Sequence, residues 1–179
     1  MSMRIRIPVE NDLPALAHLD AEAFPAEPYP FYVLRQFFDL YHDHLLVLAD
    51  GDTLYGYIIA TWPRNGVSWI LSLGIAPDRQ GQGLGRLLMA ELLMQLRSER
   101  VHKVHLTVDP DNDRAVALYR HLGFTPIGDV HKDYFGPGEH RILMTLDLSD
   151  STAPPPKTPP SAPSATVKSG RTGGPRPFW

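Results

Sequence analysis

A glycine-rich segment, Gln80-Gly81-Gln82-Gly83-Leu84-Gly85, lies between an apolar run and a strongly amphipathic run. The apolar run, Val67–Ala76, is typical of a strand, and Leu84–Arg100 is typical of a helix with one row of leucines. The alternating glycines let the backbone turn its N–H groups inward and let a ligand approach closely. Because the unpaired N–H groups and the dipole of the following helix point at the same loop, the segment can bind a pyrophosphate without a charged side chain. Arg79 and Arg86 add positive charge on either side.

Two other kinds of glycine-rich nucleotide loop follow a strand in the same way, and the surrounding sequence disfavours both. A dinucleotide fold repeats strand–helix–strand units and places an acidic residue after its second parallel strand, a pattern that this chain lacks. A nucleoside-triphosphate loop ends in a lysine, which is missing here. A tight turn that needs glycine only for packing is the structural alternative, and three alternating glycines favour the ligand site over it.

The hydrophobic periodicity of residues 3–148 predicts an α/β (α+β) domain, with a mixed central sheet and the element order βααβββαβαββ. Apolar or alternating runs predict about seven strands, at Met3–Pro8, His44–Ala49, Thr53–Trp62, Val67–Ala76, His102–Val108, Phe124–Val130 and Arg141–Leu148. Patterns of helical period predict four flanking helices, at Leu13–Ala23, Phe31–Tyr41, Leu84–Arg100 and Asn112–Leu122.

The composition changes sharply near Asp150. Residues 150–179 are dominated by Pro, Ser, Thr and Gly and lack apolar periodicity. Such a segment cannot bury enough apolar surface to offset the entropy that it would lose on ordering. We therefore expect one folded domain over residues 1–149 and a disordered tail over residues 150–179.

Composition disfavours several classes of function. The chain has no cysteine, which excludes disulfides, thiolate metal sites and a cysteine nucleophile, and we predict no metal site. No apolar run approaches the ~20 residues of a membrane span, and the first residues lack the apolar core of a signal peptide. We therefore expect a cytoplasmic protein with no membrane partner.

The charge of the chain is unevenly distributed. Four of its 17 basic residues and none of its 20 acidic residues follow Asp150, so residues 1–150 hold 13 basic and 20 acidic residues and a net charge of −7. An acidic domain disfavours a nucleic-acid partner and is compatible with a cationic substrate such as an amine. Solubility alone also accounts for such a balance.

Two motifs, in this order, resemble those of the GNAT acetyltransferases. The first is Leu73–Pro77 followed by Arg79–Gly85, in which Gln80, Gly83 and Gly85 fit the Gln/Arg-x-x-Gly-x-Gly/Ala pattern of the family. The second runs through Leu106–Val108, Asn112, Ala115–Tyr119 and Leu122–Phe124, and it is similar to the strand, asparagine, Ala-x-x-x-Tyr helix and Gly-Phe ending of the family. The resemblance covers residues 3–148 and is strongest to the ribosomal-protein N-terminal alanine acetyltransferase branch.

This resemblance implies the GNAT fold, in which strands Val67–Ala76 and His102–Val108 splay apart and admit the pantetheine arm of acetyl-CoA. It implies transfer of an acetyl group from acetyl-CoA to a primary amine by direct attack in a ternary complex. The backbone of Leu73 and Ile75 would pair with the arm, and the amides of the glycine-rich segment would hold the pyrophosphate. The implied cofactor-binding residues are Leu73, Gly74, Ile75, Arg79, Gln80, Gly81, Gln82, Gly83, Leu84, Gly85, Arg86, Asn112 and Tyr119.

The resemblance also implies a proton donor. Tyr119 would face the cofactor sulfur and protonate the leaving thiolate, whereas the structural alternative is a core tyrosine on an amphipathic helix. The proton acceptor is less defined. The family branch carries glutamate where this chain has Thr107, and some eukaryotic N-terminal acetyltransferases carry a histidine there, with a tyrosine near the position of Trp69. Neither Thr107 nor Trp69 can act as a base. His105 lies two residues before Thr107, on the same side of the strand, and can take a proton directly or through water. Thr107 or Ser72 can hold that water.

Aromatic residues on two loops resemble those that border the acceptor side of protein N-terminal acetyltransferases. The first loop carries Phe24, Tyr29 and Tyr32, and the second, Lys132–Glu139, carries Tyr134 and Phe135. They favour a protein or peptide amine as the acceptor, with a polyamine or amino sugar as the alternative. A non-catalytic acyl-CoA sensor is a third hypothesis, and Tyr119 argues against it. We expect a monomer or a homodimer.

Overall fold

A computed structural model describes residues 2–149, so the predicted domain boundary and the tail lie outside the described residues. Seven strands and four α-helices occur in this part of the chain, in the predicted order βααβββαβαββ, which is confirmed. The strands are β1 (Arg4–Arg6), β2 (Leu45–Asp50), β3 (Thr53–Ala60), β4 (Val67–Ile75), β5 (Lys103–Val108), β6 (Thr125–Pro126) and β7 (Ile142–Asp147). The helices are α1 (Leu13–Ala23), α2 (Phe31–Leu40), α3 (Leu84–Ser98) and α4 (Asp113–His121).

The strands form one mixed sheet in the order β1-β2-β3-β4-β5-β7-β6. Neighbouring strands are antiparallel except β4 and β5, which run parallel. A parallel pair needs a crossover connection, and α3 supplies it. This arrangement places the glycine-rich segment, residues 80–85, at the carboxyl end of β4.

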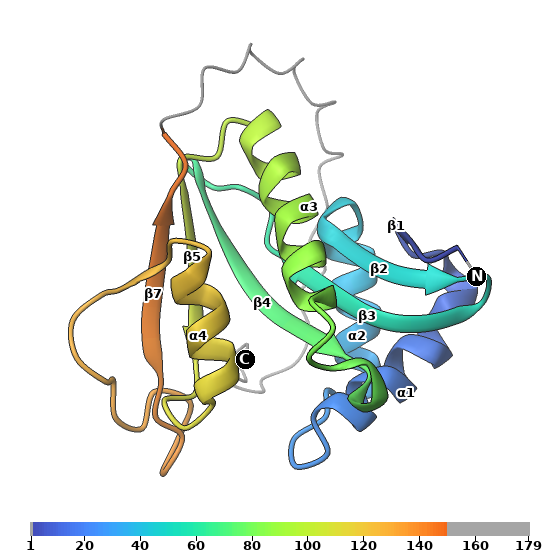
Figure 1. Ribbon diagram of the computed structural model, residues 1–179, viewed down its shortest axis with the longest axis horizontal. Coiled ribbons are helices and arrows are strands. Elements are labelled where there is room, and N and C mark those ends of the chain that lie inside the picture. The colour runs from blue at the N-terminus through green and yellow to red at the C-terminus, as the bar shows by residue number, and fades with distance from the viewer. Residues whose placement is uncertain (1, 150–179) are drawn as a thin grey trace, which may run out of the picture.

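Strands β4 and β5 separate along their length (Figure 1). Their pairing begins at Val67 and Lys103 and ends at Ile70 and Leu106, although β4 continues to Ile75. A β-bulge at Leu71 marks the point of separation, because Ile70 and Ser72 pair with consecutive residues of β3. The predicted splayed pair is therefore present, and the edge of β4 that faces β5 has no strand partner beyond Ile70.

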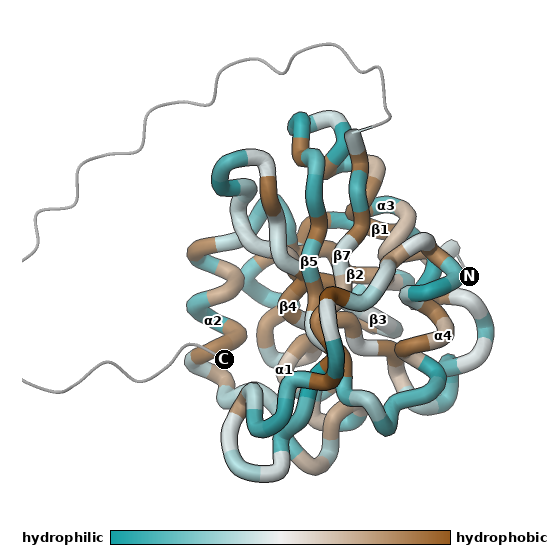
Figure 2. The backbone as a smooth tube through the Cα atoms, turned by 90° about the vertical axis from the view of Figure 1, so that its left-hand side faces the viewer, coloured by the Kyte–Doolittle hydropathy of each residue, from teal (hydrophilic) through white to brown (hydrophobic). Residues whose placement is uncertain are grey.

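Helices cover both faces of the sheet (Figure 1). On one face, the leucine row of α3 packs with α4 against the inner strands, and Leu88, Leu92 and Leu96 have no exposed surface. On the other face, α1 and α2 cover β2 and β3, with Leu16 and Leu34 almost fully buried. Hydrophobic and hydrophilic residues alternate along the helices, as expected of elements with one buried face, and several outer loops are hydrophilic (Figure 2).

The late strand is shorter than predicted. The sequence suggests a strand over Phe124–Val130, whereas β6 contains only Thr125 and Pro126. Phe124 points into the core beside Tyr119, with 5.9 Å between ring centroids. Pro126 has no N–H to donate, and Gly128 has a φ of +69°, which ends an extended conformation. The predicted strand was too long because it followed the apolar residues past Pro126 and Gly128, which interrupt strand pairing.

Candidate active site

The glycine-rich segment leads directly into the amino end of α3. Gly81 and Gly83 have φ values of +76° and +80°, and open space surrounds the position of a Cβ atom at both residues. Gly83 is the N-cap of α3 and offers no capping side chain, and its carbonyl accepts from the N–H of Leu87 at 3.1 Å. The N–H groups of residues 84–86 therefore have no acceptor within the helix, and the first turn carries no acidic residue. This end of α3 fits a bound pyrophosphate.

Arg114, at the start of α4, contacts the same loop. Its Nη1 atom donates to Oε1 of Gln80 at 3.1 Å, and Nε2 of Gln80 donates to the carbonyl oxygen of Ile75 at 3.2 Å. These bonds join the amino ends of two helices across the open end of the split. The sequence analysis did not single out Arg114. It lies two residues after Asn112, and because β4 and β5 run parallel, the start of α4 lies beside the glycine-rich loop.

The two predicted arginines differ in their surroundings. The guanidinium of Arg79 stacks over the ring of Tyr55 at 4.9 Å and forms an ion pair with Asp78 at 3.4 Å. Arg86 is exposed in the first turn of α3 and forms no ion pair within residues 2–149. Of the two, Arg86 is the better placed to meet an anion at the helix end.

The glycines near the split allow close packing. A Cβ atom at Gly74 would lie 2.6 Å from the ring of Tyr57 and 3.2 Å from that of Phe24, so the packing of those rings explains this glycine. At Gly85 a Cβ atom would lie 3.6 Å from Leu118 and 3.7 Å from Leu73, at ordinary contact distance. The space between Gly85 and β4 is therefore lined by apolar side chains.

Asn112 acts as the N-cap of α4. Its side-chain oxygen accepts a hydrogen bond from the N–H of Ala115 at 3.1 Å. An N-cap amide contributes ~1 kcal/mol to helix stability. Helix capping is a structural role that accounts for the asparagine in the motif.

Tyr119 points from α4 into the core and is 9% exposed. Burial raises the pKa of its phenol to about 12. Its hydroxyl takes part in no hydrogen bond among the described residues. A neutral phenol without a partner can donate a proton or a hydrogen bond to a ligand that enters the split.

His105 and Thr107 lie on the opposite face of β5. Their neighbours Val104, Leu106 and Val108 are buried in the core beneath α3 and α4, so the alternation of the strand turns His105 and Thr107 toward the other side. Burial, followed by the charge of Lys103, lowers the pKa of His105, and its Nδ1 atom is buried without a hydrogen-bond partner. His105 therefore stays neutral near pH 7 and can accept a proton.

The predicted acceptor aromatics are not all gathered at one place. Phe24 lies over Gly74 on β4. Tyr29 packs edge-on against Phe37, with 5.2 Å between centroids, and its hydroxyl donates to the carbonyl of Leu71 at 3.4 Å, so it supports the bulge of β4. Tyr32 is 59% exposed on α2.

The second aromatic loop forms its own cluster. The rings of Tyr134 and Phe135 are 5.1 Å apart, and Arg141 lies 4.8 Å above the ring of Phe135. Tyr134 is 43% exposed and therefore remains open to a partner, whereas Phe135 is partly covered.

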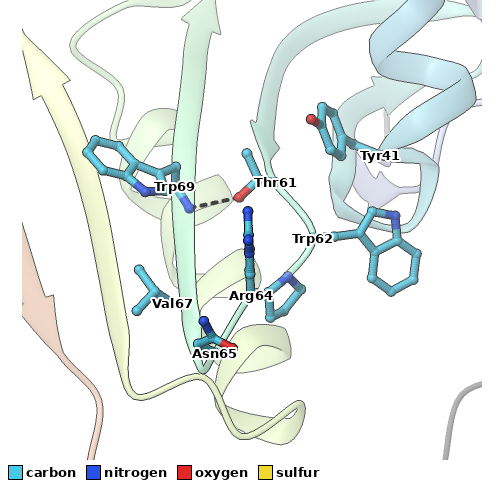
Figure 3. Close-up of a pocket in the computed structure, with 8 residues that line it drawn as sticks. Tyr41, Thr61, Trp62, Arg64, Asn65, Val67 and Trp69 are labelled. Atoms are coloured by element: carbon cyan, nitrogen blue, oxygen red, sulfur yellow. Dashed lines mark hydrogen bonds between the residues drawn. The ribbon is translucent and has the colours of Figure 1, made fainter.

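A pocket of about 530 Å³ lies where the β3–β4 connection meets the end of α2 (Figure 3). Aromatic side chains line much of it, together with Arg64 on the connecting loop. Trp69 belongs both to this pocket and to the His105 side of the sheet, because its ring lies 4.9 Å from that of His105. The residues that line it are Tyr41, Thr61, Trp62, Pro63, Arg64, Asn65, Val67 and Trp69.

Comparison with known proteins decides the family. The sequence profile described as "Acetyltransferase (GNAT) family" matches residues 13–124, which is more than half of the chain. The chain belongs to the GNAT acetyltransferase family. The predicted fold and enzyme class are thereby confirmed, and so is acetyl-CoA as the acetyl donor that this family uses.

Relatives within the family differ in their named substrates. The chain is 33% identical to N-alpha-acetyltransferase RimI of Mycobacterium tuberculosis over 145 residues, which cover 78% of this chain and 89% of the relative. It is 44% identical to mycothiol acetyltransferase of Beutenbergia cavernae over 93 residues, which cover 50% of this chain. The chain spans only 30% of the length of that second relative.

Solved structures share the fold. The ribosomal-protein-S18-alanine N-acetyltransferase from Escherichia coli superposes with a TM-score of 0.71 at 26% identity, over 84% of this chain and 96% of that protein. The Salmonella typhimurium acetyltransferase yncA with its cofactor acetyl-CoA gives a TM-score of 0.68 at 21% identity, over 86% of this chain and 98% of that protein, and this likeness concerns the fold alone. No helix within residues 2–149 is long and apolar enough to cross a membrane.

Proposed function

We propose that this GNAT enzyme acetylates a protein amine, at an N-terminus or on lysine, with acetyl-CoA as the donor. The observation that carries the proposal is the split between β4 and β5, with a helix amino end at its open end and a polar face bearing His105 and Thr107 on its other side. Donor and acceptor can thus approach from opposite faces of one sheet. The similarity to RimI over 89% of that protein supports a polypeptide acceptor.

The chain has groups that fit acetyl-CoA, which supplies an activated acetyl thioester when bound. The unpaired amides of Leu84, Gly85 and Arg86 would hold its pyrophosphate, with Arg114 nearby. The free edge of β4 at Leu73 and Ile75 would pair with its pantetheine arm as an added strand does. One acceptor there, the carbonyl of Ile75, already accepts a hydrogen bond from the side chain of Gln80. Gln80 would therefore have to share this acceptor with the arm or move away.

Tyr119 would hold a proton at its hydroxyl and donate it as a hydrogen bond to the departing sulfur. Its burial and raised pKa keep the phenol protonated throughout the working pH range. A thiol has an ordinary pKa of ~8.5, below that of this buried phenol, so the hydrogen bond from Tyr119 would stabilise the sulfur as its negative charge develops, while the proton stays mainly on the phenol oxygen. Solvent would protonate the thiolate as the product leaves.

The acceptor amine has to lose a proton before it can attack. An N-terminal ammonium has a pKa of ~8 and a lysine ammonium one of ~10. One group on this face that can accept a proton is the neutral imidazole of His105, directly or through a water held by Thr107. The exposed Tyr134 and the pocket beside Trp69 offer contact surface for a chain extending beyond the amine.

A small-molecule amine is the second candidate. It is favoured by the 44% identity to a mycothiol acetyltransferase over half of this chain. That match leaves most of the relative without a counterpart here, which makes the polypeptide acceptor the stronger proposal.

The proposal is tested by thiol release from acetyl-CoA with two panels of amines. One panel holds peptides that vary in their first two residues, and the other holds polyamines, amino sugars and lysine. We expect kcat/KM for the best peptide to exceed that for every small amine by at least ~100-fold, because remote contacts add transition-state binding. A small amine as the best substrate would replace the polypeptide by the second candidate, and no release with any amine would favour an acyl-CoA sensor.

A further inference from the structure

Asp20 of α1 is a carboxylate with no exposed surface and no cationic partner among the described residues. Burying an ionised carboxyl group without a counter-charge is expensive, and such groups are rare. The groups that face it are the hydroxyl of Tyr57 from β3 and the N–H of Tyr29 from the loop after α1, each at 2.6 Å. Helix α2 presents only apolar side chains, Leu34 and Phe37, to this core.

A chain of hydrogen bonds leads from Asp20 to β4. The hydroxyl of Tyr57 lies 2.7 Å from Oγ of Ser72 as well as 2.6 Å from Oδ1 of Asp20. An ionised carboxylate can only accept, so Tyr57 donates its one proton to Asp20 and accepts from Ser72. Ser72 then donates to Tyr57 and keeps lone pairs for a further donor.

Ser72 lies just beyond the point where β4 and β5 part. It is the second residue beyond Ile70, the last residue of β4 that pairs with β5. The bulge at Leu71 turns Ser72 toward Tyr57, on the face of the sheet that also bears Trp69 and His105. Ser72 is half-buried, so one end of this chain of hydrogen bonds is partly open to solvent, and the other end is a carboxylate that solvent cannot reach.

We propose that Ser72, Tyr57 and Asp20 form a relay that takes the proton from the acceptor ammonium. The N–H bond of the ammonium breaks as Oγ of Ser72 gains a proton. The hydroxyl proton of Ser72 passes to Tyr57, and the proton of Tyr57 passes to Oδ1 of Asp20, which becomes a neutral acid. When the product leaves, the proton returns to solvent along the same path.

The surroundings of the relay suit this task. Burial is the largest influence on Asp20 and raises its pKa, so the protonated form is favoured more than in an ordinary aspartate. The neutral acid also removes the buried charge at the moment when the amine becomes neutral. Ser72 touches the amine, whereas Tyr57 and Asp20 act through it as positioning and proton-holding residues. This inference rests on the proposed transfer to an amine.

The decisive experiment is the pH dependence of turnover in Ser72→Ala, with Ser68→Ala as the matched control. Ser68 lies on the same strand, is fully buried and donates to the carbonyl of Thr61 at 2.9 Å, outside the relay. We expect Ser72→Ala to lower kcat ~100-fold at neutral pH with acetyl-CoA affinity unchanged, since proton-transfer groups are typically worth ~100–10,000-fold. The loss should shrink as the pH approaches the pKa of the amine, because the amine then arrives deprotonated. Ser68→Ala should keep the turnover of the unmodified protein.

A loss in Ser72→Ala that is the same at every pH would overturn the relay, since a structural defect has no reason to be rescued by amine deprotonation. Unchanged turnover in Ser72→Ala would overturn it as well. If the unmodified protein acetylates no amine at all, the proposed function fails, and a measurement that needs no substrate still tests the relay. Infrared titration of the protein alone should show a carboxyl band that persists above the ordinary range of aspartate and is absent in Asp20→Asn. A carboxyl that titrates in the ordinary range would contradict its ability to hold the proton.

Discussion

The rings of Trp69 and His105 lie 4.9 Å apart, tilted by 53°, on the only parallel strand pair that the described sheet contains. Trp69 and His105 are partners in the register of β4 and β5, next to the last paired residues before the strands part. The indole of Trp69 therefore packs against one side of the His105 imidazole, at the closed end of the split between β4 and β5. This contact shields His105 from solvent, in agreement with its lowered pKa.

The first prediction concerns His105→Gln. Glutamine keeps a donor and an acceptor near the position of the imidazole but cannot take a proton. Because the relay from Ser72 to Asp20 supplies the proton acceptor, we expect kcat to fall less than ~10-fold and its pH dependence to stay unchanged, as a modest loss of positioning would give. The measurement is a pH–rate profile at saturating peptide. If the rise of turnover with pH shifts upward instead, His105 is the base.

The second prediction concerns Tyr119→Phe. This change keeps the ring against Phe124 and removes only the hydroxyl, which makes no hydrogen bond within the described part of the chain, so folding and acetyl-CoA affinity should survive. Loss of this donor should lower kcat ~100–10,000-fold and change KM little. Steady-state kinetics and calorimetric titration with acetyl-CoA check the two halves. An unchanged kcat would show that the thiolate leaves unaided.

The third prediction concerns Gly83→Val. Gly83 has a φ of +80° and open space at its Cβ position, so a side chain there would meet a ligand rather than the protein. We expect most of the acetyl-CoA affinity to be lost, as measured by calorimetric titration.

The control for backbone strain is Gly51→Val, in the turn between β2 and β3. Gly51 has a φ of +59° and equally open surroundings, and a side chain in this left-handed region costs ~1–2 kcal/mol at either position. Both variants should therefore melt lower, but only Gly83→Val should lose acetyl-CoA. Full affinity in Gly83→Val would move the pyrophosphate site away from α3.

The fourth prediction concerns the pH dependence of stability at Asp20. Its pKa in the folded chain is raised above 3.8, so the folded state binds this proton more tightly than the unfolded state. The free energy of unfolding should therefore fall as the pH rises from 3.8 through the raised pKa of Asp20. In Asp20→Asn this decline should be absent. Denaturant unfolding of both proteins across that pH range tests the difference, and parallel curves would mean that the pKa of Asp20 is not raised.

The element order and the glycine-rich segment could be predicted because both depend on local patterns. The leucine row of α3 and the alternation along β5 are short-range features, and Gln80–Gly85 follows one strand and starts one helix. The shortened β6 was missed because Pro126 and Gly128 interrupt pairing within an otherwise apolar run.

The polar half of the site depends on contacts between distant segments. Asp20 and Tyr57 are 37 positions apart, and Tyr57 and Ser72 are 15 apart, so no local pattern joins them. One signal was present: Asp20 falls on the same helical face as Leu13 and Leu16, where a carboxylate is out of place unless it has a buried partner. The bulge at Leu71 that turns Ser72 toward Tyr57 leaves no comparable trace in the sequence.

The most direct test of the account uses acetyl-CoA labelled in its acetyl group and a peptide with a free N-terminus and one internal lysine. Fragment masses of the product show which nitrogen carries the label. We predict label on a peptide amine, with its rate lowered ~100-fold at neutral pH in Ser72→Ala and restored toward that of the unmodified protein as the pH rises. An unlabelled peptide, with label instead on a small amine supplied in the same mixture, would contradict the proposed acetylation of a protein amine.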